Sequence, residues 1–497
     1  MDKLRTVLEH QITPNSFSKV KLIEISDCAK LVTIFPSHLV RNFQNLETLK
    51  VKNCNSVEEI FDHRELQDEK THANVGGISC HLRYLNLQGL PKLKYIWSGD
   101  PKGVFKLVQD LQSVEVEECK NLNYIFSAPV AKCLLQLEKL EIISCGVTKI
   151  VSEDEGSSGV VRFHFPQLKH IKLKSLPKIK SFYPEVMFTL ECSMLKELDI
   201  DVFDICNEIL LSPVEKVIVP KLESLCLGAK TTTILYLNDQ FQDLFRTLKI
   251  LRVCDCSSLR SLVHTSYSST LFRNLHTLEI ESCDGLINLV TFSTLKSTLV
   301  RLQNLSIRNC EKIEEIISST GHQVQHVEDD EIAFNQLESL KLFCLPNLKC
   351  FSREKCTLKF PSLKEVIVVA CPKLEVFSSG ILVAPLLCGV IQNKYLEGEK
   401  RWEGDLSNTV KGMFIDMQEE MAKGFPNIIK HPLHKKHELL LARGTHGCDG
   451  CGEYRDGWSY FCGRCEFDLD PGCALEDSNK TTNESGNEQV EESNIRR

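Results

Sequence analysis

One spacing of apolar residues recurs along most of this chain. Its consensus, L-x-x-[LV]-x-[LIV]-x-x-[CL]-x-x-[LIV]-x-x-[IL], is met by "LETLKVKNCNSVEEI" from residue 46 and by "LHTLEIESCDGLINL" from residue 275. Most successive copies begin 26 or 27 residues apart, which is typical of a repeat array rather than of a single globular core. The thirteen copies begin at Val20, Leu46, Leu82, Leu111, Leu137, Leu168, Leu195, Leu222, Leu248, Leu275, Leu302, Leu337 and Leu363.

The spacing within each copy predicts its local structure. The first apolar positions alternate with a period of two, as in a short strand, and the later ones place two more side chains inward after a turn. The ninth position is Cys in eight copies, where a small residue able to bond neighbouring backbone groups is favoured. A single copy cannot bury its apolar side alone, so the copies must stack. This is the leucine-rich-repeat pattern, and it predicts an α/β repeat fold, a solenoid of about 13 repeats over residues 20–390 behind an N-terminal segment at 1–19.

In such a solenoid the residues that flank the third apolar position point outward from a concave sheet. These pairs carry alternating blocks of charge, with apolar pairs towards the C-terminal end, and such a surface is the usual binding site of solenoids. A merely solvated face is the alternative. The pairs are Glu24/Ser26, Lys50/Lys52, Asn86/Gln88, Glu115/Glu117, Glu141/Ile143, Lys172/Lys174, Asp199/Asp201, Cys226/Gly228, Arg252/Cys254, Glu279/Glu281, Ser306/Arg308, Lys341/Phe343 and Ile367/Val369.

Composition and charge narrow the class of protein. The 497 residues are 42% hydrophobic and 25% charged, as in soluble globular proteins, and the net charge of −8 argues against a general nucleic-acid binder. The start of the chain lacks the pattern of a signal peptide, and no apolar run is long enough to span a membrane. We therefore expect a protein of the cytoplasm or nucleus. Eighteen of the 23 cysteines are scattered through residues 28–388, so we expect them to be reduced, buried thiols.

The remaining segments outside the repeats have simpler interpretations. Residues 391–425 should form a C-terminal cap and linker, with a helix over 404–424 whose N-cap is Asp405. Polar insertions at 61–79, 152–164 and 319–335 should be surface loops, and residues 477–497 a disordered tail. The last insertion is read as a solvated acidic loop rather than a metal site, although it contains His322, His326, Glu328, Asp329 and Asp330.

Residues 426–476 carry the candidate chemistry. The stretch "HGCDGCGEYRDGWSYFCGRCEFDLDPGC" holds two Cys-x-x-Cys pairs and a fifth cysteine, with His431, His434 and His437 upstream. Cysteine and histidine at these spacings suit tetrahedral zinc, and eight ligands would fill two sites. A segment of this size has little core, so metal would supply much of its folding energy. Trp458, Tyr460, Phe461, Phe467 and Leu469 should form its apolar centre.

Two other interpretations of the cysteine pairs are weaker. A disulfide knot needs an oxidising compartment, which nothing in the sequence indicates. A redox centre needs a thiolate of low pKa at a helix N-terminus, and neither "CDGC" nor "CGRC" lies in a strand-to-helix context. Zinc is therefore the predicted cofactor.

The repeats resemble those of a known class of immune receptor. Copies of Cys type alternate with copies of Leu-Pro type, such as "LNLQGLPKLKYIWSG" and "LKLFCLPNLKCFSRE". With the stretch "EKRWEGDLSNTVKGMF" after the last repeat, residues 15–415 are similar to plant disease-resistance receptors of the coiled-coil, nucleotide-binding, leucine-rich-repeat class. The chain contains no G-x-x-x-x-G-K-[ST] phosphate-binding loop, so the nucleotide switch of that class is not carried over. The resemblance implies defence-related recognition of a pathogen effector or host target, with a nucleotide-binding receptor acting in trans as a further partner.

The C-terminal segment resembles a second family. It is similar to plant Cys/His-rich domains that diverge from the diacylglycerol/phorbol-ester-binding zinc fold, and to the C-terminal tail of plant nucleoredoxins. The resemblance implies two interleaved zinc sites, one with Cys448, Cys451 and Cys473, the other with Cys462, Cys465 and two upstream histidines. We favour His434 and His437 over His431. The family's histidine falls on Asp470 here, which would make this carboxylate the fourth ligand of the first site.

Three functions follow from these observations. The first is a non-enzymatic recognition protein whose solenoid binds a protein and whose zinc domain is an appended interaction module. The second is a redox-linked factor that acts through the Cys-x-x-Cys pairs. The third is a truncated fragment of a resistance gene without an independent role.

Overall fold

The fold is described from a computed structural model. The predicted tail at 477–497 and the acidic loop residues His322 to Asp330 lie outside the described residues, as does most of the segment at 1–19. The chain divides into two compact units, which we describe separately. The first comprises Met1–Leu259, His264–Glu279 and Ser297–Val300, and the second Arg260–Val263, Ile280–Lys296 and Arg301–Arg497. The structure describes residues 17–36, 42–63, 81–99, 108–153, 160–183, 187–201, 214–228, 245–262, 272–295, 298–318, 331–393 and 400–476.

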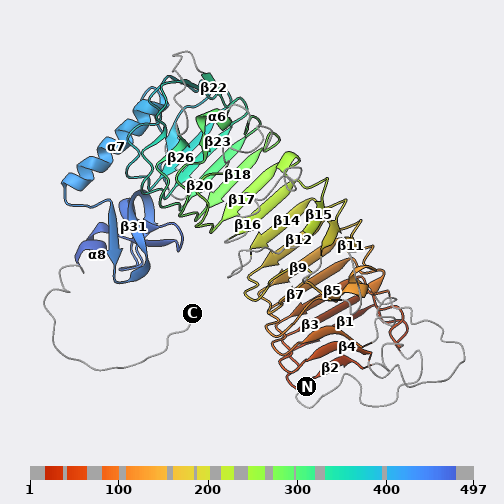
Figure 1. Ribbon diagram of the computed structural model, residues 1–497. Coiled ribbons are helices and arrows are strands. Elements are labelled where there is room, and N and C mark those ends of the chain that lie inside the picture. Colours follow the sequence, from red (N-terminus) through yellow and green to blue (C-terminus); the bar gives the residue numbers. More distant parts are fainter. Residues whose placement is uncertain are drawn as a thin grey trace, which may run out of the picture. The chain divides into compact units, whose positions relative to one another are not determined.

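Each of the thirteen copies supplies one five-residue strand of a parallel main sheet, beginning two residues after the start of the copy (Figure 1). Equivalent positions pair across the sheet, as Leu49 does with Leu85. In the first unit the order is β1 (Leu22–Ser26), β3 (Thr48–Lys52), β5 (Tyr84–Gln88), β7 (Ser113–Glu117), β9 (Lys139–Ile143), β12 (His170–Lys174), β14 (Glu197–Asp201), β16 (Ser224–Gly228) and β17 (Ile250–Cys254). The tenth copy forms β18 (Thr277–Glu281). Within the second unit the order is β20 (Asn304–Arg308), β23 (Ser339–Phe343), β26 (Glu365–Val369), β28 (Val390–Ile391) and the antiparallel β29 (Lys400–Arg401).

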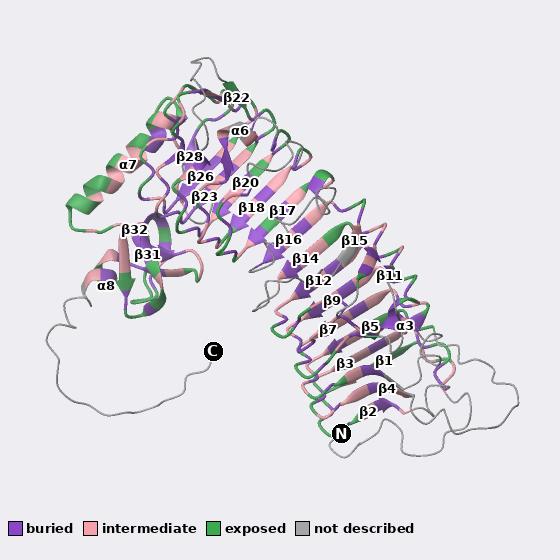
Figure 2. Cartoon of the chain, in the orientation of Figure 1, coloured by how far each residue is buried: buried purple, intermediate pink, exposed green. Residues whose placement is uncertain are grey.

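The predicted burial pattern is confirmed in these strands. Leu49 and Val51 of β3 are fully buried, whereas Thr48, Lys50 and Lys52 are partly exposed, and the same alternation recurs along the sheet (Figure 2). We call the side that carries the residues flanking the third apolar position the sheet face. The opposite side of each strand faces the core, where the stacked copies bury one another's leucines, isoleucines and valines.

Among the described residues, the chain turns sharply where a repeat strand ends, which explains the cysteine at the ninth position. In most copies the eighth residue has a positive φ, for example 53° at Asn53 and 54° at Asn309. The cysteine that follows is then placed to donate its S–H to the last carbonyl of the strand, as Cys54 Sγ does to Lys52 O at 3.2 Å. All eight ninth-position cysteines make this bond, at 3.1 to 3.4 Å. The role predicted for the ninth position is therefore confirmed.

The return segments form short parallel strands behind the main sheet, and the helical turns α3 (Ala128–Ala131) and α6 (Phe292–Leu295) are only four residues long. The solenoid is confirmed, but the described return segments are largely β. In the first unit the return strands are β2 (Thr33–Phe35), β4 (Glu59–His63) and β6 (Tyr95–Gly99), then β8 (Phe126–Ser127) and β10 (Val151–Ser152), then β11 (Val161–His164), β13 (Phe188–Glu191) and β15 (Val214–Ile218). In the second they are β19 (Val290–Thr291), β21 (Glu315–Ser318) and β24 (Cys350–Ser352), then β22 (Glu331–Ala333), β25 (Thr357–Lys359) and β27 (Leu382–Val383).

The predicted linker helix is present as α7 (Leu406–Ala422). Its N-cap is Asp405, whose side chain accepts a hydrogen bond from the backbone N–H of Asn408 at 2.7 Å. Residues 426–476, which we call the module, follow as a four-stranded antiparallel sheet and a short helix. The elements are β30 (Ile428–His431), β31 (His434–Gly447), β32 (Tyr454–Cys462), β33 (Phe467–Leu469) and α8 (Pro471–Glu476).

The middle of strand β31, residues 439–442, is buried on both sides, which we did not predict from the sequence. Leu439 and Leu441 point into the module's own core, together with Tyr460 and Leu469. Leu440 and Ala442 point the other way and pack against the sheet face of the last repeats. The run "ELLLA" at 438–442 is the sequence signal of this arrangement, because continuous apolar runs occur where both faces of a strand are covered.

Two expectations therefore need correction. Phe461 was predicted to belong to the module's apolar centre, but it packs against Phe343 of β23, with ring centroids 5.9 Å apart and ring planes at 86°. The outward residues Phe343, Ile367 and Val369 were predicted to be part of an open binding face. They are only 7%, 1% and 2% exposed, because the module lies on them.

Candidate metal centre

The module brings the candidate ligands together in two groups of four. We call them the His/Cys group and the Cys/Asp group. Within each group one potential ligand atom from every residue lies within 4.8 Å of the others. The His/Cys group contains His434, His437, Cys462 and Cys465, and the Cys/Asp group contains Cys448, Cys451, Asp470 and Cys473. The groups have the composition that the resemblance implied.

The His/Cys group is assembled from the start of β31 and the end of β32. Nδ1 of His437 lies 3.6 Å from Sγ of Cys462 and 3.3 Å from Sγ of Cys465. The turn between the two cysteines is closed by a 3.3 Å hydrogen bond from the N–H of Cys465 to the carbonyl of Cys462. Burial and the neighbouring positive charge of Arg464 lower the pKa of His437. The ring is thereby favoured in its neutral form, which is the form that binds a metal.

His434 shows why this group fits a metal ion. Its ring is buried and stacks on Phe467, with centroids 4.7 Å apart, and within the described part of the chain its Nε2 has no hydrogen-bond partner. A buried polar atom without a partner is costly, and a metal ion would relieve that cost. His431 is also buried with Nε2 unbonded, but its Nδ1 accepts the N–H of Leu433 at 3.3 Å and its ring is not in the group.

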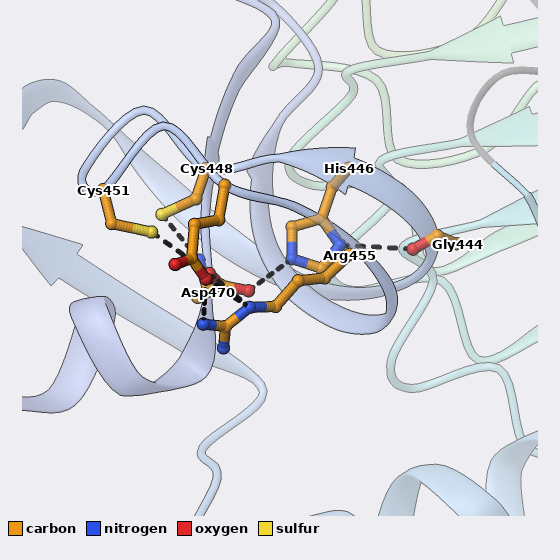
Figure 3. Close-up of polar contacts among 7 residues, drawn as sticks. Gly444, His446, Cys448, Cys451, Arg455 and Asp470 are labelled. Atoms are coloured by element: carbon orange, nitrogen blue, oxygen red, sulfur yellow. Dashed lines mark hydrogen bonds and ion pairs between the residues drawn. The ribbon is translucent and has the colours of Figure 1, made fainter.

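The Cys/Asp group is assembled from residues that follow the end of β31 and the end of β33. Figure 3 shows Cys448, Cys451 and Asp470 of this group. Sγ of Cys451 lies 3.5 Å from Oδ2 of Asp470, and the N–H of Asp470 donates to Sγ of Cys448 at 3.3 Å. Burial disfavours ionisation of Asp470, but hydrogen bonds from His446 and Cys451 and the charge of Arg455 outweigh it and lower the pKa of this carboxyl. Asp470 is therefore a carboxylate, able to contribute an oxygen ligand.

The thiols of this group differ in their readiness to ionise. Burial opposes ionisation of Cys448, but hydrogen bonds from the backbone N–H groups of Asp470, Cys451 and Gly450 outweigh it and lower its pKa. Burial, and contacts with Cys448 and Cys451, raise the pKa of Cys473 to about 12. Three thiolates and a carboxylate would repel one another at these distances. A bound cation is the simplest means of keeping all four ionised.

His446 is a functional candidate that we did not predict from the sequence. It is only 1% exposed, its Nε2 lies 2.7 Å from Oδ1 of Asp470, and its Nδ1 lies 3.2 Å from the carbonyl of Gly444 (Figure 3). A residue that hydrogen-bonds the atom of a metal ligand that does not bind the ion fixes the orientation of that ligand. The available signal was a histidine two residues before Cys448, in a module whose fourth ligand had become an aspartate.

The candidate ligand atoms of the two groups differ in chemical hardness. Two nitrogens and two sulfurs form the His/Cys group, and three sulfurs and one oxygen form the Cys/Asp group. Both are sets that tetrahedral zinc accepts, with the thiolates as soft ligands and the carboxylate as a harder one. All five module cysteines are free thiols in the structure, and each belongs to one of the two groups.

Comparisons with known proteins bear on both parts of the chain. A family described as plant disease resistance protein RPS2-like, leucine-rich repeats, matches residues 1–146 and 263–383, more than half of the chain. The chain belongs to this RPS2-like family of leucine-rich-repeat proteins. Its repeats are therefore those of plant disease-resistance proteins, as the sequence predicted.

The C-terminal region of this RPS2-like chain matches a different protein. It is similar to a probable nucleoredoxin 1 of Arabidopsis thaliana, with 47% identity over 73 residues. The match spans 14% of this chain and only 12% of that protein. In the part of the chain that the structure describes, no helix has the length and apolar character needed to cross a bilayer.

Proposed function

We propose that this chain is a non-enzymatic, defence-related recognition protein that binds a protein partner on its sheet face. The observation that carries the proposal is the combination of resistance-protein repeats with a face of ordered, mixed charge. Recognition of a protein is what a repeat surface of this kind offers.

The charges on the first unit's sheet face are held in place by pairs between adjacent strands. Nζ of Lys139 lies 2.7 Å from Oε1 of Glu115 and 3.1 Å from Oε2 of Glu141. The amide of Asn86 donates to the other oxygen of Glu115 at 2.8 Å. Individually such exposed pairs contribute little to stability, but they fix the positions of the charges. A partner would therefore meet a defined polar pattern.

The pattern continues over the following repeats. The ring of His170 lies between Glu141, at 3.1 Å, and Glu197, at 2.9 Å. On the same two strands as His170 and Glu197, Nζ of Lys174 pairs with Asp199 at 3.0 Å. Carboxylates accompany each of these basic groups, so the face is suited to a protein surface of mixed charge rather than to a phosphate backbone.

We further propose that the module holds two zinc ions. His434, His437, Cys462 and Cys465 would hold one, and Cys448, Cys451, Asp470 and Cys473 the other. Bound zinc would supply cross-links between the strands and the turns of a domain with a small core. Asp470 would be oriented by His446, and the harder carboxylate makes this the weaker of the two sites.

A redox role is the second candidate, and the similarity to a nucleoredoxin favours it. Each Cys-x-x-Cys pair lies in a four-ligand group, however, and a reactive thiolate would have to leave its ion. We expect the zinc-loaded chain to show no turnover in an insulin-reduction assay with dithiothreitol, beyond the rate of dithiothreitol alone. Turnover that is lost in Cys462→Ser would support the redox function instead.

A photo-crosslinking experiment tests recognition by the sheet face. A photoreactive amino acid would replace Lys172 on β12, and in a matched control Arg162 on the return strand β11, which is exposed on the opposite side of the repeats. In plant extract we expect a discrete adduct from position 172, reduced when Glu141→Lys and Glu197→Lys are combined in the same chain. Equal adducts from positions 162 and 172, or none from either, would contradict the proposal. An adduct with a nucleotide-binding immune receptor would identify a receptor that acts in trans.

A further inference from the structure

The last repeats carry an apolar patch on the sheet face that the module covers. Phe343 of β23, Ile367 and Val369 of β26, and Ile391 of β28 form the patch. All four are buried, although their positions in the repeats point them away from the solenoid core. The module contributes Leu440, Ala442 and Phe461 to the same cluster. Without the module these side chains would form a contiguous apolar surface, which is typical of a protein-binding site.

Polar contacts fix the module on this patch. The guanidinium of Arg464 contacts the carboxylate of Asp284 and donates to the carbonyl of Asn309 at 2.9 Å. A second carboxylate, that of Glu311, lies 3.8 Å from the same nitrogen. The arginine is 22% exposed, so the contacts are partly shielded from water and are stronger than an exposed ion pair.

The module's loop packs so closely on the repeats that the residue before Arg464 has to be a glycine, Gly463. A Cβ added at Gly463 would lie 2.5 Å from Oδ1 of Asn309 and 2.7 Å from Sγ of Cys344. The loop backbone therefore contacts the end of β23 directly, and Cys344 lies under it, 4% exposed.

Docking and metal ligation depend on the same loop. Gly463 and Arg464 are the two residues between the ligands Cys462 and Cys465, and Phe461 directly precedes them. An ion bound to both sulfurs would fix the turn that presents Gly463 and Arg464 to the repeats. Release of the ion would free the turn and remove the shape on which the docking contacts depend.

We propose that the module is a metal-dependent, intramolecular occupant of this apolar patch, and that loss of the ion from the His/Cys group releases it. This inference rests on the proposed zinc function of the module. Release uncovers a surface with an apolar centre and two carboxylates at its edge, Asp284 and Glu311. A protein partner for that surface presents an aromatic or aliphatic side chain next to a cationic one, as the module itself does with Phe461 and Arg464.

Helix α7 keeps the released module close to the patch. Asp416 of α7 pairs with Arg401 of β29 at 2.5 Å and lies 3.8 Å from Arg443 of the module. A tethered domain competes for the patch at a high effective concentration. An external partner therefore displaces the module only when the module's own contacts with the patch weaken. The metal site would thereby control access to this end of the sheet face.

Labelling of Cys344 measures whether the patch is covered. Tryptic cleavage after Lys341 and Lys349 yields a peptide with Cys344 as its single cysteine. The zinc-loaded full chain would be treated with iodoacetamide with and without a chelator. We expect chelation to raise the labelling rate of Cys344 at least ten-fold, and added zinc to reverse the effect. Cys283, fully buried in the repeat core, is the internal control and should remain unlabelled.

A substitution in the repeats can weaken docking of the module without removing any candidate metal ligand. Asp284→Ala removes the carboxylate that Arg464 contacts and leaves every residue of the two ligand groups in place. It should raise labelling of Cys344 several-fold with the zinc content unchanged. Glu338→Ala is the matched control, because Glu338 pairs with Lys364 at 3.0 Å and not with the module. Cys344 that stays protected after complete metal removal and in Asp284→Ala would overturn the inference.

A second variant tests the same docking contact by steric clash instead of by loss of charge. Gly463→Ala should also expose Cys344, whereas Gly472→Ala should not, since a Cβ at Gly472 meets nothing within 4 Å. If the purified chain contains no zinc, the zinc proposal fails. Asp284→Ala and Gly463→Ala would then still decide whether the module covers the patch, and protection of Cys344 in both would reject the cover itself.

Discussion

Nε2 of His446 lies 2.7 Å from Oδ1 of Asp470, and both side chains are almost completely buried. The contact leaves Oδ2 of Asp470 facing Cys451, at 3.5 Å from its sulfur. His446 thereby holds the carboxylate of Asp470 in one orientation. In the proposed Cys/Asp zinc site, His446 would orient the aspartate that stands where the resemblance implies a histidine.

Substitution of His446 should weaken one metal site and not the other. His446→Leu leaves Asp470 without its orienting partner, and we expect zinc affinity at the Cys/Asp group to fall about 10- to 100-fold. His446→Gln, which can still donate to Asp470, should lose less. A competitive chelator titration of the full chain measures both sites. If His446→Leu leaves both zinc affinities unchanged, the orienting role is wrong.

Asp470→Asn tests whether the carboxylate is a ligand. The amide keeps the size of the side chain but removes the charge that would face zinc. We expect the weaker step of the chelator titration to shift by at least about ten-fold, with the stronger step unaffected. An unchanged weaker step would mean that water or another residue completes the Cys/Asp group.

The sequence predicts local features of this chain well and long-range ones poorly. The solenoid, its strands, the ninth-position cysteines and the N-cap Asp405 follow from spacings of a few residues, and the structure contains them. The composition of the two ligand groups follows from the family resemblance. The contact between Arg464 and Asp284 joins residues 180 positions apart, and no local pattern encodes it. Only the run "ELLLA" and the apolar outward residues Phe343, Ile367 and Val369 indicated that something covers that face.

Within the repeats, inward and outward positions should respond very differently to substitution. Leu278 is fully buried between stacked copies, and Leu278→Asp would bury an unpaired charge there. We expect a loss of roughly 4 kcal/mol or more in the free energy of unfolding. Glu279→Gln, at the next position, weakens only the exposed pair with Arg252 at 2.5 Å and should cost at most about 0.5 kcal/mol. Chemical denaturation followed by circular dichroism compares the two, and similar losses would contradict the assignment of faces.

The carboxyl group of Asp201 should make the stability of the fold depend on pH. Burial, then the nearby charge of Asp255, raise the pKa of Asp201, whose Oδ1 has no hydrogen-bond partner among the described residues. Because the folded pKa is raised, the charged carboxylate destabilises the fold above that pKa, and protonation removes the penalty as the pH falls. Asp201→Asn should therefore stabilise the chain at pH 7 by roughly 0.5 kcal/mol.

This advantage should disappear below the ordinary pKa of about 3.9, where the wild-type side chain is neutral in the folded and unfolded states. Thermal unfolding of both proteins between pH 3.5 and 7.5 tests the sign. An advantage of Asp201→Asn that grows as the pH falls would contradict it.

The central claim is that the module is a two-ion zinc domain, and metal content tests it most directly. The full chain would be purified without added metal and analysed by native mass spectrometry, together with Cys465→Ser and Cys451→Ser. We predict two zinc ions per wild-type chain and one in each variant, since the substitutions fall in different groups. Fewer than one ion in the wild-type chain, or two in both variants, would contradict the account.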